Sequence, residues 1–296
     1  MDNAVSKVIL GTVQFGVDYG IANSSGKPSF SMVKEILSLA YERGIRMLDT
    51  AAAYGESEEV LGRALHELGL ASEMRIVSKI SPLPAGCSRE TAVEMIDTCL
   101  TNSLKRLQID QLEAVLFHRE NEAHLLPELQ KQAIAGGRAG RVGISIDSSA
   151  AVDIDLSGAS CIQLPMNFFD HRFDAFALAA EKRDVSIYCR SVYLQGLAVM
   201  PEEKIPASLL DIVPFRRKLA ELAGEAGMDI KELAFRYMLG QPGVAGVLTG
   251  VDTVEQMAEN CAIAAKGALP DDLHRAVIAA VPLLPEELIR PSLWKR

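Results

Sequence analysis

Short apolar runs alternate with longer amphipathic segments along the whole chain. Each run is typical of a strand that is buried on both faces of a parallel sheet. Between the runs, apolar residues recur at helical spacing, as Ile36, Leu37 and Ala40 do. The pattern predicts eight strands, at residues 7–10, 45–48, 75–78, 112–116, 141–144, 161–164, 185–189 and 246–249.

The amphipathic segments predict helices that connect these strands. Gly44 and Gly69 follow the first two, where a glycine often ends a helix. Ser57 is the predicted N-cap of the second, with Glu58 and Glu59 in its first turn. Eight parallel strands joined by helices predict one (β/α)8 barrel domain over residues 1–296. The main predicted helices cover residues 31–43, 57–68, 88–107, 125–135, 173–182, 215–226, 230–239, 253–266 and 271–280.

Composition and charge exclude several classes of function. The 296 residues are 49% hydrophobic and 23% charged, as in an ordinary globular protein with a large core. The net charge of −9, without clustered lysine and arginine, argues against nucleic-acid and membrane partners. The five scattered cysteines lack paired spacing and indicate reduced thiols. No signal peptide or membrane-length apolar run is present, so we expect a cytoplasmic protein. We also expect no metal ion.

Polar residues that suit proton transfer follow three neighbouring strands. Asp49 ends the second strand, Tyr54 lies in the loop after it, Lys79 follows the third strand and His118 follows the fourth. In a barrel of this type, active-site groups lie at the C-terminal ends of the strands. An ammonium lowers the pKa of a nearby phenol, and a carboxylate can hold that ammonium in place. An imidazole can orient a carbonyl oxygen, so these four residues are the predicted catalytic group.

Further polar or small residues occur at the remaining strand ends. We expect them to line the same face of the barrel, where a ligand would bind. They are Gly11, Thr12, Ser145, Gln163, Arg190, Ser191, Thr249 and Gly250.

Several segments together resemble the aldo-keto reductase superfamily. They read LGT, LDTAxxYGxSExxLGxAL, VSK, LxxxxxH, GxVGIS, QLPxN, SVYLQGL and GVxxxEQMAEN, in this order over nearly the whole chain. The resemblance implies a barrel that transfers hydride from a nicotinamide cofactor to a small aldehyde or ketone, with sugar-like molecules among the candidates. It also implies that Tyr54 is the general acid, Lys79 tunes it, Asp49 holds Lys79 and His118 orients the substrate.

The resemblance extends to residues around the nicotinamide. It implies that Ser145 and Gln163 bind the carboxamide, but Ile146 stands where the family often has Asn, and Asn167 lies too far along to replace it. Arg190 takes the place of an aromatic residue that stacks on the ring. A guanidinium can also stack, and a fixed cation would disfavour the cationic oxidised cofactor. We therefore expect a bias toward reduction.

The segment after the last strand resembles the adenosine-binding end. Glu259 and Asn260 match residues that contact adenine. Gly250 and Gln256 stand where many members carry a lysine and an arginine that clamp a 2′-phosphate, and Asp252 adds a negative charge. NADPH is the cofactor that the family implies, and these substitutions keep NADH as an alternative.

Two departures concern the barrel bottom and the substrate loops. Few residues precede Val8, so the N-terminal β-hairpin that plugs many of these barrels is missing or reduced. Trp294 either covers the pocket or docks the C-terminal segment. Four loop residues are candidates for the pocket wall, with plain loop packing as the alternative: Phe15, Tyr19, Phe168 and His171.

Two other functions are compatible with the same barrel. A Schiff-base aldolase would use Lys79 as its nucleophile, but pairing with Asp49 would keep this lysine protonated. A non-catalytic barrel could bind the cofactor as a sensor or regulatory subunit, although such a protein has no physical need for all four catalytic residues. Carbonyl turnover distinguishes the enzyme from the sensor.

Overall fold

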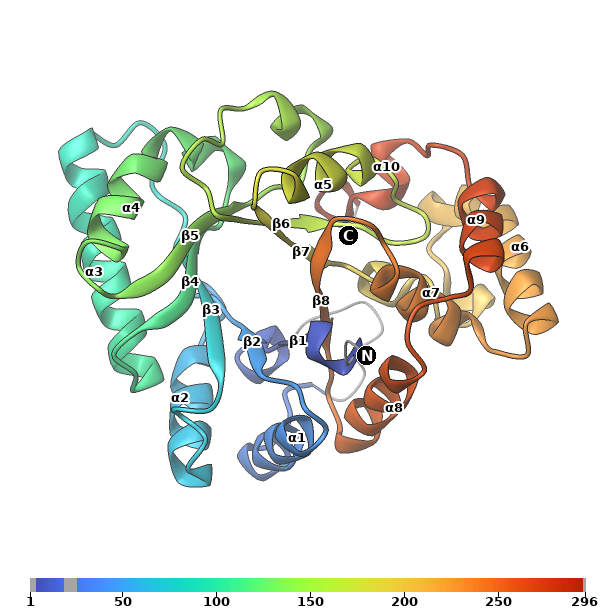
Figure 1. Cartoon of the computed structure of the whole chain (residues 1–296), viewed down its shortest axis with the longest axis horizontal. Helices are drawn as coiled ribbons and strands as arrows, with labels where there is room; N and C mark the ends of the chain where they lie inside the picture. Colours follow the sequence, from blue (N-terminus) through green and yellow to red (C-terminus); the bar gives the residue numbers. More distant parts are fainter. Residues whose placement is uncertain (1–3, 19–25, 295–296) are drawn as a thin grey trace.

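A closed barrel of eight parallel strands forms the centre of the molecule (Figure 1). The computed structural model describes residues 4–18 and 26–294. Each strand pairs with the next along the chain, and β1 closes the barrel by pairing with β8. The predicted fold class is therefore confirmed. The strands are β1 Val8–Gly11, β2 Met47–Asp49, β3 Arg75–Ile80, β4 Leu112–Phe117, β5 Ala139–Ser145, β6 Cys161–Pro165, β7 Ser186–Arg190 and β8 Val244–Gly250.

Side chains alternate between the barrel interior and the layer beneath the helices, as the two-residue period of a strand requires. In β1, Ile9 belongs to the interior cluster, while its neighbour Leu10 packs outward. At Gly143 in β5, a Cβ atom would lie 1.8 Å from the carbonyl oxygen of Cys161. This position tolerates only glycine because β6 approaches so closely. The interior cluster is Ile9, Met47, Val77, Ala114, Leu116, Cys161, Tyr188 and Leu248.

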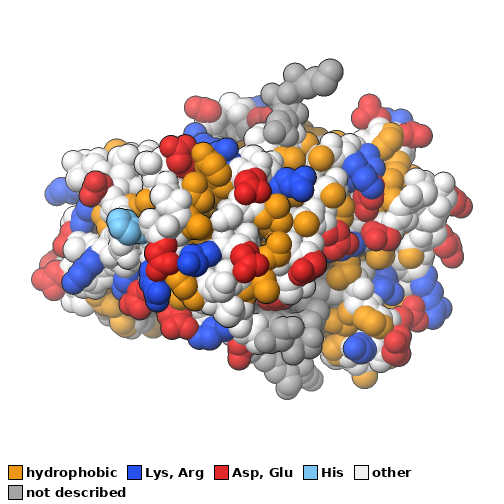
Figure 2. Space-filling view, turned by 90° about the horizontal axis from the view of Figure 1, so that it is seen from below, with side chains coloured by type: hydrophobic (Ala, Val, Ile, Leu, Met, Phe, Trp, Pro, Cys, Tyr) orange, Lys and Arg blue, Asp and Glu red, His pale blue; other side chains and the backbone are white. Residues whose placement is uncertain are grey.

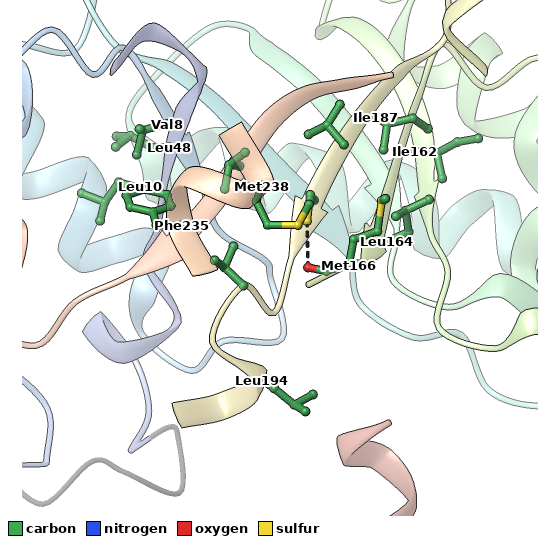
Figure 3. Packing of buried hydrophobic residues seen from close by; sticks show 14 of the residues in the cluster. Val8, Leu10, Leu48, Ile162, Leu164, Met166, Ile187, Leu194, Phe235 and Met238 are labelled. Carbon is green, nitrogen blue, oxygen red and sulfur yellow. Dashed lines mark hydrogen bonds between the residues drawn. The ribbon is translucent and has the colours of Figure 1, made fainter. Parts of the chain in front are cut away.

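The helices surround the barrel and cover its outward-facing apolar residues (Figure 1). Figure 3 shows Phe235 and Met238 of α7 in this layer with residues of several strands. All five cysteines are free thiols. The helices are α1 Phe30–Glu42, α2 Ser57–Leu68, α3 Arg89–Leu107, α4 Leu126–Ala133, α5 Asp174–Glu181, α6 Val213–Glu225, α7 Ile230–Leu239, α8 Val254–Ala265, α9 Asp271–Ala280 and α10 Glu286–Ile289.

The predicted N-cap of α2 is wrong. Glu56 occupies the N-cap position, and Ser57 is the first helical residue. The Ser57 hydroxyl donates instead to the Thr12 carbonyl oxygen at 2.7 Å and lies 3.0 Å from the hydroxyls of Thr12 and Thr50. These tertiary hydrogen bonds compete with the local cap, and they join the loops that follow β1 and β2.

The described chain starts with a 3-10 turn, Ala4–Lys7, whose Val5 is buried. Within residues 4–18, no strand precedes β1. Across the described ranges, none of the helices has the length and hydropathy to cross a bilayer. On the face drawn in Figure 2, the coloured acidic and basic side chains are interspersed, without one dominant basic patch.

Candidate active site

A cavity of about 300 Å³ opens at the C-terminal ends of the strands. Residues from β1, β2, β6, β7, β8, α7 and α8 line it, together with residues of the loops after β1, β2 and β7. A volume of this order lies within the range of small-ligand pockets. Its wall includes these residues that the sequence singled out: Gly11, Thr12, Asp49, Tyr54, Gln163, Arg190, Ser191, Thr249, Gly250, Gln256 and Asn260.

A buried ion pair joins β2 to β3 beside this cavity. The Lys79 Nζ atom donates to both carboxylate oxygens of Asp49, at 2.8 and 2.7 Å, and to the Thr50 carbonyl oxygen at 2.9 Å. Gln163 Nε2 donates to Asp49 from β6 at 2.7 Å. Burial lowers the pKa of Lys79, but the Asp49 carboxylate and the Tyr54 phenol together hold it above its ordinary value. Lys79 is therefore an ammonium at neutral pH.

Tyr54 lies close to both this ammonium and an imidazole. Lys79 Nζ lies 5.1 Å from the centroid of the Tyr54 ring. The rings of Tyr54 and His118 meet edge to face, with their centroids 5.6 Å apart. Tyr54 is half-buried and lines the cavity, so its phenol faces the space where a ligand would lie. The structure thus brings all four predicted catalytic residues together.

His118 is neutral at physiological pH. Burial lowers the pKa of this histidine to about 4, and the charges of Lys79, Arg190 and Arg119 act in the same direction. Its Nδ1 atom is buried without a hydrogen-bond partner among the described residues. A neutral imidazole carries one donor and one acceptor nitrogen. His118 can therefore donate a hydrogen bond to an oxygen atom without adding a positive charge.

The chain leaves β7 in a strained turn that forms part of the cavity wall. Ser191, Leu194 and Gln195 have φ values of 65°, 47° and 54°, in the left-handed region that favours glycine. Asn167 Nδ2 holds this turn by donating to the Ser191 carbonyl oxygen at 3.1 Å. Such strain persists only where surrounding contacts enforce it, and it concentrates at functional sites.

Comparison with known proteins decides the family. The model of the aldo/keto reductase family matches residues 7–281. The chain belongs to the aldo/keto reductase family. It is an oxidoreductase of this family, whose members use NAD(P)H.

Curated and solved relatives agree with this membership. The chain is 31% identical to "Aldo-keto reductase YhdN" of Bacillus subtilis (strain 168), over 73% of each protein. It is 25% identical to "Uncharacterized oxidoreductase YqkF" of the same organism, over 93% of this chain and 92% of the relative. Two solved structures share its fold. Glycerol dehydrogenase AKR11B4 from Gluconobacter oxydans has a TM-score of 0.71 and 23% sequence identity, over 93% of this chain and 90% of that one. Aldo-keto reductase AKR11C1 from Bacillus halodurans has a TM-score of 0.73 and 19% identity, over 96% of this chain and 95% of that one.

In this aldo-keto reductase, Arg190 is an ion-paired cation. Its Nη2 atom donates to Asp147 Oδ1 at 2.8 Å and to the Ile146 carbonyl oxygen at 3.0 Å. The fixed cation expected at the nicotinamide position therefore has a carboxylate beside it. Because the charge of Asp147 partly offsets that of Arg190, the electrostatic basis of the predicted bias toward reduction is smaller than an unpaired arginine would give.

Another part of the cavity wall is formed by β8, α7 and α8. Asn260 Nδ2 donates to the Thr249 hydroxyl at 3.0 Å, and the amide is buried. Gln256 Oε1 accepts from the backbone of Asp252 at 2.8 Å, and the Asp252 side chain also lines the cavity. A Cβ atom at Gly250 would lie 2.4 Å from the side chain of Gln14. The Gln14 amide therefore occupies the space that a larger side chain at position 250 would need.

Several predicted ligand residues lie away from the cavity wall. Ser145 is buried at the end of β5, and Glu259 forms an ion pair with Lys231. Phe15 and Phe168 are buried in the core, because their loops fold back onto the barrel. They are therefore packing residues and not wall residues.

The remaining loop and tail candidates have different outcomes. His171 contacts Asp174 and Tyr237, at 3.2 and 3.3 Å, outside the cavity lining. Tyr19 lies outside the described residues. Trp294 packs against the core and is not part of the cavity wall, which supports its docking role over its covering role.

Sequence reasoning missed other wall residues. Tyr193 and Gln195 lie within the SVYLQGL segment, so that motif was a usable signal. Lys231 belongs to α7, far from any strand end, and nothing in its sequence context indicated a wall position. Gln14 lies in the loop after β1, and its sequence context gave no signal for a wall position.

Proposed function

We propose that this aldo-keto reductase reduces a small aldehyde or ketone to an alcohol, with Tyr54 as the proton donor. The observation that carries the proposal is the buried Lys79 ammonium, which Asp49 holds beside the Tyr54 ring. An ammonium in this position stabilises a phenolate and so favours release of the phenol proton. Lys79 and Asp49 would therefore make an ordinary tyrosine an effective acid at neutral pH.

Each residue has a separate task in this reaction. A reduced nicotinamide dinucleotide, when bound, supplies the hydride that adds to the carbonyl carbon. The Tyr54 hydroxyl gives its proton to the carbonyl oxygen, and Lys79 stabilises the phenolate that remains. His118 donates a hydrogen bond to the same oxygen and, being neutral, does not compete as an acid. Gln163 orients Asp49, which in turn orients Lys79.

The polar groups of the cavity fit a dinucleotide. Gln14 Oε1 is buried in the wall without a hydrogen-bond partner among the described residues, as expected for a group that meets a ligand donor. Thr12, Gln163 and Asn260 add amide and hydroxyl groups at intervals along the same wall. These residues would hold the cofactor through hydrogen bonds. We detect no group of acidic, histidine or cysteine residues suited to a metal ion in the described ranges.

The charges at the α7–α8 end favour NADH at least as much as NADPH. Gly250 and Gln256 supply no cation, and the Asp252 carboxylate lines the wall. Lys231 lines this end as a cation, and Glu259 already offsets its charge. A 2′-phosphate needs cationic partners, whereas a carboxylate can accept a hydrogen bond from a ribose hydroxyl. We therefore expect Asp252→Asn to shift the preference toward NADPH.

The aldolase alternative is disfavoured by the state of Lys79. A Schiff-base nucleophile must be a neutral amine, whereas the pKa of Lys79 is raised by Asp49 and Tyr54 against the effect of burial. The sensor alternative makes a different prediction, since it requires cofactor binding without carbonyl turnover. Both alternatives predict that the protein does not reduce carbonyl compounds, so an assay of carbonyl turnover tests both.

The test combines turnover with cofactor binding. Purified protein is assayed with NADPH and with NADH on a panel of aldehydes, ketones and hydroxyaldehydes, and dinucleotide binding is followed by fluorescence. Tyr54→Phe should lower kcat by roughly 10²- to 10⁴-fold and leave dinucleotide affinity unchanged. Tyr41→Phe is the matched control, because Tyr41 lies on α1 and contacts Arg46 away from the cavity. Normal turnover by Tyr54→Phe would refute the proton-donor role, and failure of both dinucleotides to bind would refute the reductase.

A further inference from the structure

Asp147, which follows β5, joins the cavity wall to the C-terminal segment. Its Oδ1 atom accepts from Arg190 Nη2 at 2.8 Å. Its Oδ2 atom accepts from Arg290 Nε and from the Ser292 hydroxyl, both at 2.7 Å. Burial raises the pKa of Asp147, but these partners together hold it well below its ordinary value. The carboxylate is therefore negative throughout the physiological range.

The backbone of Asp147 is held as firmly as its side chain. Its N–H group donates to Glu120 Oε2 at 2.7 Å, and its carbonyl oxygen accepts from Arg172 Nη1 at 3.1 Å. Glu120 also accepts from the N–H group of Ser148 at 3.1 Å. Contacts from the loops after β4 and β6 thus fix the backbone that carries the carboxylate. These backbone contacts do not involve Arg190.

A second carboxylate anchors the C-terminal segment without touching Arg190. Glu286 of α10 accepts from the Ser149 N–H group at 2.9 Å and from Arg290 Nη1 at 2.9 Å. It also forms an ion pair with Arg172, in the loop after β6, at 3.0 Å. Ion pairs join three arginines to three carboxylates here: Arg172, Arg190 and Arg290 to Asp147, Asp170 and Glu286. The formal charges of these six residues cancel.

We propose that Asp147 is a positioning residue that sets how strongly this reductase distinguishes the oxidised from the reduced form of its cofactor. The inference rests on the proposed function, which places the nicotinamide in the cavity that Arg190 lines together with Tyr54. Asp147 holds the guanidinium at the wall and offsets its charge. The oxidised nicotinamide ring is cationic and the reduced ring is neutral, so only the oxidised form responds to that charge.

The charge of Arg190 is felt at the reacting centre even when it is paired. It contributes to the lowered pKa of His118, which lies against Tyr54. Removal of the Asp147 charge would leave one uncompensated positive charge at the cavity wall. A cationic ring beside it would bind more weakly, while a neutral ring would bind as before.

The test measures both cofactor forms on the same protein. The dissociation constants of the oxidised and reduced dinucleotide are determined by titration calorimetry for the wild type and for Asp147→Asn. The ratio of the oxidised to the reduced constant should rise about fivefold in the variant, as expected for one unit charge several ångströms away in a half-solvated site. The increase should shrink at high salt because screening weakens the repulsion.

Glu286→Gln is the matched control. It makes the same change of charge in the same network, yet Glu286 does not contact Arg190. Its ratio should stay at the wild-type value. The double variant Asp147→Asn/Arg190→Gln should return the ratio to the wild-type value, since both charges of the pair are then gone. A merely structural role of Asp147 would weaken both cofactor forms equally.

The outcomes separate this inference from the proposed function. If the wild type binds neither dinucleotide, the proposed function fails and the inference falls with it. If both forms bind and the ratio is unchanged in Asp147→Asn, the reductase stands and the inference is overturned. An equal rise in Glu286→Gln would also overturn it, because net charge alone would then explain the effect. Should Asp147→Asn fail to fold, Arg190→Gln provides the measurement, and its ratio should fall below that of the wild type.

Discussion

Replacement of Asp49 by asparagine removes a charge from the centre of the site and keeps the side-chain volume. Lys79 is 1% exposed, and its Nζ atom would then keep neutral partners, among them the Thr50 carbonyl oxygen at 2.9 Å, but would lose the carboxylate that balances its charge. Loss of one partner of a buried pair costs about 3–5 kcal/mol, because the remaining charge is left uncompensated in the interior. We expect Asp49→Asn to lower the free energy of unfolding by this amount at neutral pH.

The loss should depend on pH, and the sign follows from Lys79. In the wild type its pKa is raised, so the stability that it contributes is present below the ordinary value of 10.5 and is lost only above it. In Asp49→Asn, burial remains while the carboxylate is gone, so the folded-state pKa falls below the unfolded one. The penalty is then largest at low pH and decreases as the pH rises. Between about pH 7 and pH 9.5, the deficit should shrink by at least ~1 kcal/mol.

Urea unfolding followed by circular dichroism at both pH values measures this deficit. Glu58→Gln is the control, because Glu58 is also 1% exposed and accepts from Arg106 Nε and Nη2 at 2.8 and 2.6 Å. A guanidinium cannot lose its proton, so this deficit should be the same at both pH values. The reasoning is refuted if the two variants show the same pH dependence, or if Asp49→Asn costs less than about 1 kcal/mol at pH 7.

Three further predictions follow from single residues. His118, with a pKa of about 4, should give no inflection in kcat/KM between about pH 5 and 8, and an inflection near 6.5 that His118→Asn removes would contradict this. It should lower the free energy of unfolding as the pH falls from 6.5 toward 4, because the unfolded chain binds the proton at a higher pH than the folded chain does. Gly143→Ala should lower the free energy of unfolding by more than about 4 kcal/mol in thermal unfolding, because its Cβ would meet the Cys161 carbonyl oxygen at 1.8 Å. Gly140→Ala is the control and should lower it only slightly, because the nearest backbone oxygen to a Cβ there is 3.3 Å away. Ser57→Ala should cost about 1–3 kcal/mol in urea unfolding, more than a lost helix cap, and a cost below 0.5 kcal/mol would remove its assigned role.

The barrel and its four central residues were predictable because both depend on local pattern and on one topological rule. Apolar runs marked the strands, and the C-terminal ends of neighbouring parallel strands meet at one face. Asp49, Lys79 and His118 each stand at or just beyond such an end, so their proximity follows from the fold alone. Tyr54 lies in a short loop between β2 and α2, which limits how far it can move from that face.

The remaining features depend on contacts between distant loops. Arg190 lies 43 residues from Asp147 in sequence, and the Arg290 contact spans 143 residues. No local periodicity encodes such pairs, because loop side chains choose partners only after the barrel has brought the loops together. Ser57 is a second example, because local sequence predicted a helix cap, whereas its hydroxyl forms hydrogen bonds with residues of distant loops. For an aromatic loop residue such as Phe168, the sequence left open whether it lines the pocket or packs in the core, because burial depends on how the loop folds back.

The placement of the cysteines provides built-in reporters of barrel opening. Cys161 lies inside the barrel and Cys189 in the layer outside it, on adjacent strands, while Cys87 is only partly buried in the loop after β3. Burial raises the pKa of the Cys161 thiol to about 12, so an alkylating reagent finds almost no thiolate there. Cys161 therefore reacts only when β6 separates from its neighbours. The difference between its labelling rate and that of Cys87 measures how often the barrel itself opens.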